Sequence, residues 1–202
     1  MSAEETLAQI AKEVAVCKKC VLHESRNKSV PGEGPANAEI MLIGEGPGFY
    51  ENEQGRPFVG ASGKFLSELL AGAGLKREEV FICNVVKCRP PANRDPLPEE
   101  LSACNTYLDR QIEAINPSII ITLGRFSMGK FMPGAKISQV HGQMRKIGDR
   151  YVIAMFHPAA ALHQVRFRPM LLEDFAKLPK LLEEARATLG KSKTKKKTTK
   201  KK

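Results

Sequence analysis

The chain has 202 residues, 42% of them hydrophobic and 27% charged, which fits a single globular domain with one core. The longest apolar runs, such as residues 119–121, are far shorter than the ~18 residues of a membrane helix, and the acidic first residues are unlike a secretory signal. We therefore expect a protein of the cytoplasm with no membrane partner.

Most of the net charge of +10 lies near the C-terminal end. Residues 191–202 contain eight lysines and no acidic residue, which leaves residues 1–190 with a formal charge of only +2. Such a run repels itself and has nothing apolar to bury, so we expect a single domain over 1–190 and a disordered Lys-rich tail over 191–202. Loose binding of nucleic acid and simple solubilisation are both open as roles for this tail.

Short apolar runs alternate with helical patterns along the rest of the chain. Apolar residues three and four apart predict a helix at the start, with Leu7, Ile10 and Val14 on one face. Strands are predicted at 39–44, 80–86, 118–123 and 151–156. Helices are predicted over 62–74, from Pro98 to about 115, and over about 169–188 with a kink or break at Pro179.

Near-continuous apolar strands separated by helices are typical of a parallel sheet covered on both faces. We therefore predict an α/β fold, a three-layer α/β/α sandwich around a central four-stranded parallel sheet. Ligands of such folds bind outside the carboxyl ends of the strands. The segments that follow the four strands are 45–48, 84–89, 124–125 and 157–158, and we expect them to meet at one edge.

The first of these segments is rich in turn-forming residues. The sequence GEGPG at 44–48 fixes a tight turn and lets backbone N–H groups approach a ligand. It lacks the Gly-Lys-Ser/Thr of a P-loop, and Phe49 stands where a GxGxxG motif needs its third glycine. A plain connecting turn is the alternative, but the acid at Glu45 and the aromatic Phe58 favour a binding loop.

The cysteines point to a metal centre. Cys17 and Cys20 have the spacing of a chelate and are flanked by lysines, while Cys88 and Cys104 bracket a Pro-rich loop. The second CxxC of a zinc ribbon is missing, whereas four separated thiolates suit an iron–sulfur cluster. Five unrelated thiols remain the alternative, and Cys83 lies within a strand pattern and is expected to be a buried hydrophobe.

The last strand runs into His157 and Pro158. A lone histidine after a strand is more often structural than catalytic. The cations Arg166 and Arg168 nearby nevertheless favour a loop that faces phosphate.

Together these segments resemble the family 4 uracil-DNA glycosylases, the iron–sulfur branch of the uracil-DNA glycosylase superfamily. GEGPG with GRPFVG, then CNVVKCRPP, TLGR and HPAA, occur in the order of that family over residues 14–178. The resemblance implies a monofunctional DNA-repair hydrolase that cleaves the N-glycosidic bond of deoxyuridine in DNA. It would release uracil, leave an abasic site and not cut the strand.

The resemblance implies roles for individual residues. A 4Fe–4S cluster of structural role would be held by Cys17, Cys20, Cys88 and Cys104. A pocket for the flipped base would be lined by Glu45, Gly46, Pro47, Phe58, Asn84 and His157. In it Phe58 stacks on the base, Asn84 reads its edge and His157 faces O2. The implied catalytic residues are His157, Asn84 and Glu45, and Glu51 matches a second acid near the pocket.

Two positions depart from related patterns. The first motif has Glu45 and lacks the Asp that orients water in family 1, so either Glu45 or Glu51 is open as the group that activates water. The loop after the histidine often carries a leucine wedge where this chain has Ala161, with Leu162 next. We expect DNA contacts from Leu162, Arg166 and Arg168, and a monomer that acts on single- or double-stranded uracil-containing DNA.

Two other classes of function stay open on the sequence. One is a non-catalytic module of the same fold that binds uracil or single-stranded DNA. The other is an iron–sulfur redox protein that uses the same cysteines.

Overall fold

The computed structural model describes the backbone of residues 1–199 and the side chains of residues 1–189. Of the expected disordered tail over 191–202, the side chains lie outside the described residues, and residues 200–202 lie outside them altogether. The division into a domain and a tail therefore stays a prediction. Within residues 1–199, no helix is both long enough and apolar enough to cross a membrane.

Five strands form one sheet. Their order across the sheet is β2 (Phe81–Asn84), β1 (Ile40–Gly44), β3 (Ile119–Leu123), β5 (Arg150–Met155) and β4 (Gln143–Ile147). The first four are parallel to one another, and β4 pairs antiparallel with β5 at the edge. The predicted α/β class is confirmed, but the predicted number of four strands is wrong. The sequence QMRKI of β4 has no apolar run, because an edge strand keeps most of its side chains in solvent.

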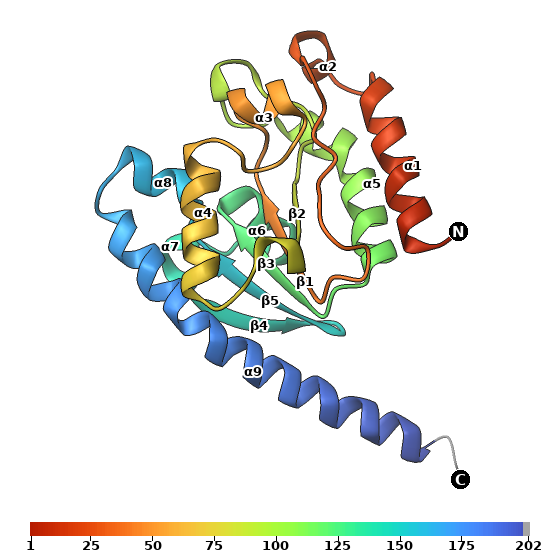
Figure 1. Ribbon diagram of the computed structural model, residues 1–202, viewed down its shortest axis with the longest axis vertical. Coiled ribbons are helices and arrows are strands. Elements are labelled where there is room, and N and C mark those ends of the chain that lie inside the picture. Colours follow the sequence, from red (N-terminus) through yellow and green to blue (C-terminus); the bar gives the residue numbers. More distant parts are fainter. Residues whose placement is uncertain (200–202) are drawn as a thin grey trace.

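Helices cover both faces of the sheet (Figure 1). They are α1 (Ala3–Val16), α2 (Leu22–Ser25), α3 (Phe49–Gln54), α4 (Ala61–Gly72), α5 (Pro98–Ile115), α6 (Arg125–Phe131), α7 (Ile137–Val140), α8 (Pro158–His163) and α9 (Phe167–Thr199). Short 3-10 turns lie at Arg77–Glu79 and Pro91–Asn93. The prediction at Pro179 was a kink or a break; α9 runs through this residue, so the break is wrong and the kink stays a prediction.

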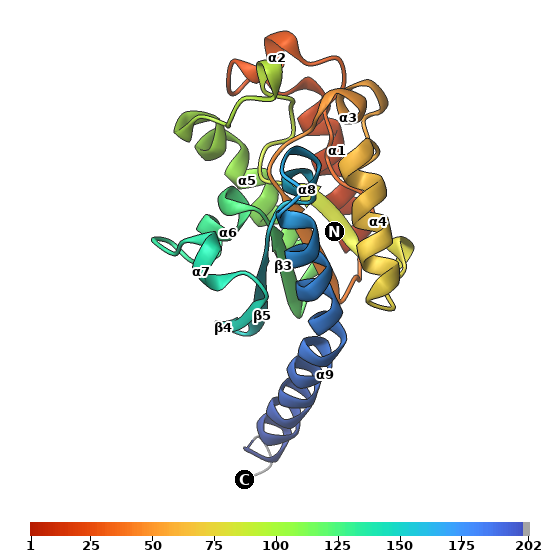
Figure 2. The ribbon, with the colours of Figure 1, turned by 90° about the vertical axis from the view of Figure 1, so that its left-hand side faces the viewer.

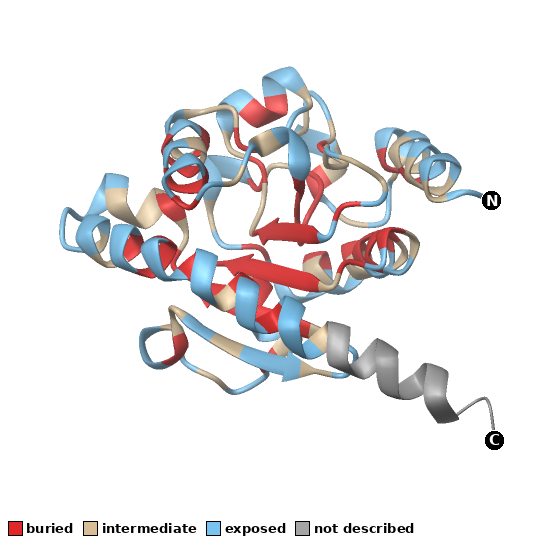
Figure 3. Cartoon of the chain, turned by 60° about the horizontal axis from the view of Figure 1, so that its bottom comes forward, coloured by how far each residue is buried: buried red, intermediate tan, exposed pale blue. Residues whose placement is uncertain are grey.

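Alternate residues of the strands feed two separate cores, as expected for a sheet that is buried on both sides. On one face Leu42 and Ile121 pack against α4 and α9. On the other face Ile43 and Ile120 pack against α5 and α6. The central strands are buried throughout, and exposed residues lie on the outer sides of the helices (Figure 3).

The carboxyl ends of the four parallel strands lie at one edge of the sheet, where α3, α4 and α8 also gather (Figure 2). The turn after β1, the segment after β2 and Gly124 come directly after strands, and His157 follows β5 after one intervening residue. The architecture therefore brings the predicted polar segments to one place.

Candidate active site

A cavity of about 610 Å³ opens at this edge. All six residues predicted for a base pocket line it, namely Glu45, Gly46, Pro47, Phe58, Asn84 and His157. The volume falls within the ~300–1,000 Å³ that is usual for small-molecule sites. The fold thus joins residues from three strand ends and the segment before α4 into one chamber.

Asn84 ends β2 and is only 1% exposed. Its side-chain Oδ1 is buried and has no hydrogen-bond partner in the described protein. A buried acceptor left unpaired costs about 1–3 kcal/mol, so the position is held for a donor that arrives with a ligand. Gly44 makes the room, because a Cβ there would lie 2.4 Å from Asn84 Oδ1.

Phe58 has a backbone φ of +51°, a conformation that bulky residues rarely adopt. The Arg77 guanidinium holds this backbone by donating to the carbonyls of Pro57 and Phe58. Gly63 closes against it from α4, where an added Cβ would lie 2.0 Å from the Phe58 carbonyl oxygen. Strain of this kind costs ~1–3 kcal/mol and persists only where the surroundings enforce it.

The rings of Phe58 and His157 lie nearly parallel, with centroids 5.5 Å apart and an interplanar angle of 26°. Nδ1 of His157 accepts the backbone N–H of Ala159 at 3.1 Å, which assigns the proton of the neutral ring to Nε2. Burial lowers the pKa of His157 to about 4, against a smaller opposing effect of Glu51. At neutral pH this histidine is therefore an uncharged donor.

The Glu45 side chain is the half-buried acid of the cavity. Burial raises its pKa to about 7; Asp95 adds to this effect and Arg125 opposes it. Asp95 and Arg125 pair with each other nearby. At neutral pH the Glu45 carboxyl is thus divided between its neutral and charged forms.

Glu51 lies in the same wall but its carboxylate is fully engaged. Oε1 accepts the backbone N–H groups of Val59 and Gly60, each at 2.9 Å, and Oε2 accepts that of Gly48 at 3.1 Å. The side chain therefore ties the turn after β1 to the loop before α4. Of the two acids that the sequence left open, Glu45 is the one whose oxygens are free to meet water.

Residues around the cavity mouth complete the comparison with the sequence. Leu162 lines the cavity and is 47% exposed, whereas Ala161 packs against the core. Arg166 and Arg168 do not line it: their guanidinium groups lie over the rings of Phe167 and Phe65.

Sequence reasoning missed two sets of residues. Phe49 and Tyr50 line the rim and are 52% and 58% exposed, and Arg77 supports Phe58 from behind. Two exposed aromatics directly after GEGPG were a usable signal for the rim. No local signal could reveal Arg77, because its partners are 19 and 20 residues away.

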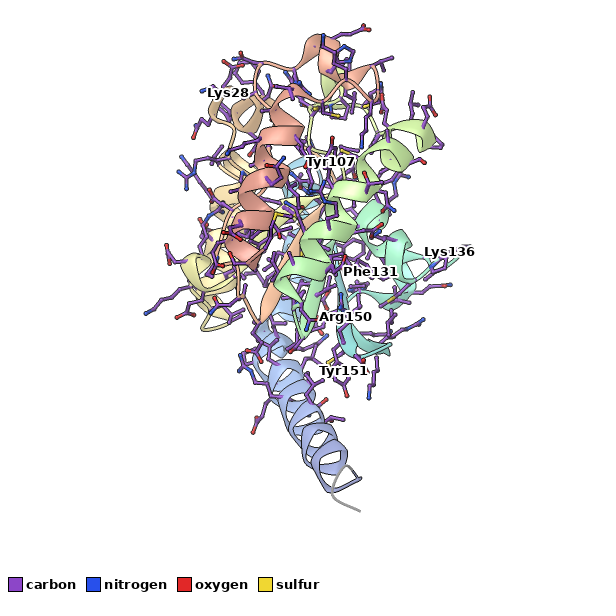
Figure 4. All side chains as sticks on the ribbon, turned by 90° about the vertical axis from the view of Figure 1, so that its right-hand side faces the viewer. Lys28, Tyr107, Phe131, Lys136, Arg150 and Tyr151 are labelled. Carbon is purple, nitrogen blue, oxygen red and sulfur yellow. The ribbon has the colours of Figure 1, made fainter. Side chains whose placement is uncertain are left out.

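The four cysteines expected to bind metal line a second, smaller cavity. Cys17 directly follows α1, Cys20 precedes α2, Cys88 follows β2 and Cys104 lies in α5. The aromatic ring of Tyr107 packs beside them between α1 and α5 (Figure 4). Cys83 is fully buried in the other core, as predicted from its strand.

The donors around this second cavity suit an anionic sulfur centre. The Arg26 guanidinium donates to Cys88 Sγ at 3.4 Å, and the backbone N–H of Lys87 donates to Cys104 Sγ at 3.3 Å. The charged side chains in its lining, Lys19, Arg26 and Lys87, are all cationic. No three potential ligands within the described residues are close enough to hold a single metal ion.

Comparison with known proteins agrees with the resemblance found in the sequence. The family model described as "Uracil DNA glycosylase superfamily" matches residues 31–183. The chain belongs to the uracil-DNA glycosylase superfamily. The match includes the whole sheet and every residue of the base pocket predicted above.

Within the superfamily, the chain is similar to several proteins named type-4 uracil-DNA glycosylase. One from Archaeoglobus fulgidus is 45% identical over 195 residues, which are 92% of this chain and 98% of that protein. Another, from Thermotoga maritima, is 43% identical over 90% of this chain and 97% of the relative. A type-5 uracil-DNA glycosylase from Thermus thermophilus is 32% identical over 64% of this chain and 68% of its own. The predicted resemblance to family 4 is confirmed.

Proposed function

We propose that this protein is a monofunctional uracil-DNA glycosylase of DNA base excision repair. It hydrolyses the N-glycosidic bond of deoxyuridine in DNA, releases uracil and leaves an abasic site. The observation that carries the proposal is the unpaired and buried Oδ1 of Asn84, a lining residue of the cavity that the stacked rings of Phe58 and His157 and the Glu45 carboxyl also line. This is a slot for one planar base that offers a hydrogen-bond donor.

Asn84 supplies the selectivity. Its Oδ1 accepts from N3–H of uracil, and its amide NH₂ donates to O4. Cytosine has an acceptor at N3 and a donor at its exocyclic amine, so both interactions become mismatched. A buried mismatch of this kind lowers the rate of cytosine excision, because polar groups of both the base and Asn84 lose their hydrogen-bond partners. Stacking against Phe58 holds the extruded base in the slot.

His157 and Glu45 divide the chemistry. As the glycosidic bond breaks, its electron pair goes to uracil and the sugar acquires positive charge. The neutral His157 donates its Nε2–H toward O2, where the negative charge develops. The ionised Glu45 favours the positive sugar and takes the proton of the attacking water. The sugar gains the hydroxyl, uracil leaves as an anion that is protonated from solvent, and the strand stays intact.

The four cysteines Cys17, Cys20, Cys88 and Cys104 would hold a 4Fe–4S cluster. When bound, the cluster cross-links the chain segments around α1, α2 and α5 and needs no redox change. The support is the cationic lining and the two N–H donors aimed at Sγ atoms.

The partner is uracil-containing DNA. Leu162, which lines the cavity and is 47% exposed, would enter the space that the extruded base leaves. Arg166 and Arg168, which follow it in the sequence, would contact backbone phosphates. We propose that the protein acts as a monomer in the cytoplasm. A uracil-binding module without catalysis would explain the pocket. It would not explain why a neutral histidine, His157, and an unpaired acid, Glu45, line the same cavity.

The test is uracil release from a labelled oligonucleotide with one deoxyuridine, read by alkaline cleavage at the abasic site. Turnover without a break before alkali is expected. Asn84→Asp should lose discrimination between uracil and cytosine, whereas the exposed control Asn116→Asp at the end of α5 should behave as wild type. DNA binding without release by a cluster-loaded protein would replace the proposal with the binding module.

A further inference from the structure

Lys87 is a buried charge that the proposed chemistry does not use. Its side chain is 0% exposed, and it lies three residues after Asn84 and directly before Cys88. Its Nζ donates to the backbone oxygen of Asn84 at 2.8 Å and to Gln111 Oε1 at 2.6 Å. Gln111 is fixed in this orientation, because its Nε2 donates to the Pro31 carbonyl at 2.7 Å. The ammonium is therefore held at the backbone of the base-reading residue.

The charge of this ammonium has no carboxylate to balance it. The ion pairs of the described residues do not include Lys87. Its two oxygen acceptors are neutral amides, and the fully buried Cys83 thiol also contacts the ammonium. A buried charge without a counter-charge is strongly unfavourable, even where its hydrogens are bonded. Lys87 lines the cysteine cavity, and its own backbone N–H bonds Cys104 Sγ. Ligated thiolates on this shared cavity wall would supply a counter-charge.

The short segment from Asn84 to Cys88 joins the two cavities rigidly. The N–H groups of Val85 and Val86 donate to the carbonyls of Gly44 and Glu45 at 3.0 and 3.1 Å. The Lys87 carbonyl accepts the Val30 N–H at 2.7 Å. A shift at Lys87 therefore reaches both the turn that carries Glu45 and the backbone of Asn84.

We propose that Lys87 is a positioning residue that couples the metal centre of the cysteine cavity to the base-reading amide of Asn84. The negative charge of the ligated sulfurs holds the ammonium, and the ammonium holds the Asn84 carbonyl. Because Oδ1 of Asn84 has no partner in the protein, only its backbone and its packing aim it at the base. This inference rests on the proposed function, because the orientation of Asn84 Oδ1 matters only if Asn84 recognises uracil.

The coupling is measured as a cycle of two changes, the substitution Lys87→Met and removal of iron by a chelator. The readout is the affinity for free uracil, with iron content checked in each state. In wild type, iron removal should weaken uracil binding at least ~5-fold, as is usual for coupled sites. In loaded Lys87→Met, binding should already be weaker, and iron removal should then change it less than ~2-fold. The control Lys136→Met changes an exposed lysine at the periphery, directly before α7, and should behave as wild type (Figure 4).

The proposal is overturned if iron removal weakens uracil binding equally in wild type and Lys87→Met, or if wild type loads no iron. Should Lys87→Met fail to fold or load, Gln111→Glu keeps the lysine and gives it a carboxylate partner. The difference in Tm between the loaded and iron-free protein should then be smaller than in wild type, while the exposed control Gln139→Glu leaves it unchanged. An unchanged difference in Gln111→Glu overturns the proposal as well. The Tm comparison uses no uracil, so it tests the coupling of Lys87 to the metal centre independently of the proposed function. The proposed function itself is refuted if the protein neither binds uracil nor releases it from DNA.

Discussion

At the scale of single residues, the pKa values of two titratable groups of the base pocket are shifted in directions that suit different tasks. Burial lowers the pKa of His157 to about 4 and raises that of Glu45 to about 7. Burial disfavours the charged form in both cases, so the histidine stays a neutral donor and the acid becomes easy to protonate. One apolar environment thus prepares an electrophile and a base together.

His157→Ala should lower kcat by about 10²–10³-fold, the usual cost of losing one preorganised donor to a developing anion. His157→Gln retains an N–H donor and should recover part of this loss. Single-turnover excision of uracil measures both effects. Equal rates for the alanine variant and wild type would refute the role assigned to this residue.

The rate of excision should rise with pH through about 7. Below this pH Glu45 is protonated, and a neutral carboxyl neither favours a positive sugar nor accepts a proton from water. Above it the carboxylate form dominates and the rate should level off. A pH profile of kcat/KM tests this, and Glu45→Gln should be both slow and flat across the same range. If the wild-type rate does not rise through about pH 7, a group other than Glu45 activates the water.

At the scale of elements, the pocket depends on loops that are clamped from several sides. Glu51 binds three backbone N–H groups from two loops, and Arg77 binds the strained segment around Phe58. Arg77 also donates to Glu33 at 2.8 Å, which in turn pairs with the exposed Arg56. Side chains with no contact to a base therefore decide where Phe58 stands.

Arg77→Met should lower the free energy of unfolding by about 2–4 kcal/mol, because two partly buried carbonyls lose their donor. It should also raise KM for uracil-DNA, since Phe58 can then leave its strained conformation. Arg56→Met is the matched control, because the Arg56 side chain is 61% exposed and, among the described side chains, pairs with Glu33 alone. Denaturant unfolding compares the two variants, and similar losses would contradict the assigned role.

Sequence patterns predicted much of this at the level of elements, for a physical reason. Buried parallel strands are apolar along their whole length, so β1, β3 and β5 are visible, and polar residues directly after them mark the site. The strand β4 lacks that signal because it is exposed at the edge. The engagement of Glu51 and the support from Arg77 depend on contacts across the fold, which residue type alone does not indicate.

At the scale of the whole molecule, charge is distributed unevenly along the chain. Residues 1–190 are nearly neutral, and the lysines of 191–202 supply most of the excess positive charge. Attraction to DNA phosphate through such a run acts by release of counterions and carries no sequence information. Binding strength and base selection are therefore expected to reside in different parts of the chain.

Deletion of residues 191–202 should weaken DNA binding and flatten the dependence of log Kd on log salt concentration. The single-turnover rate at saturating enzyme should not change, because every residue that lines the pocket precedes residue 191. Titrations at several salt concentrations give the slope for the full and shortened chains. Identical slopes would show that the tail has no part in DNA binding.

The strained conformation of Phe58 has a consequence for the end of the catalytic cycle. The slot of Phe58, His157 and Asn84 is assembled in the protein alone, so closing around a base requires little further ordering. A receptor built in advance does not distinguish a base that is still attached from one that has just been released. Free uracil should therefore act as a competitive inhibitor, and its departure, rather than bond cleavage, should limit repeated turnover on DNA rich in uracil.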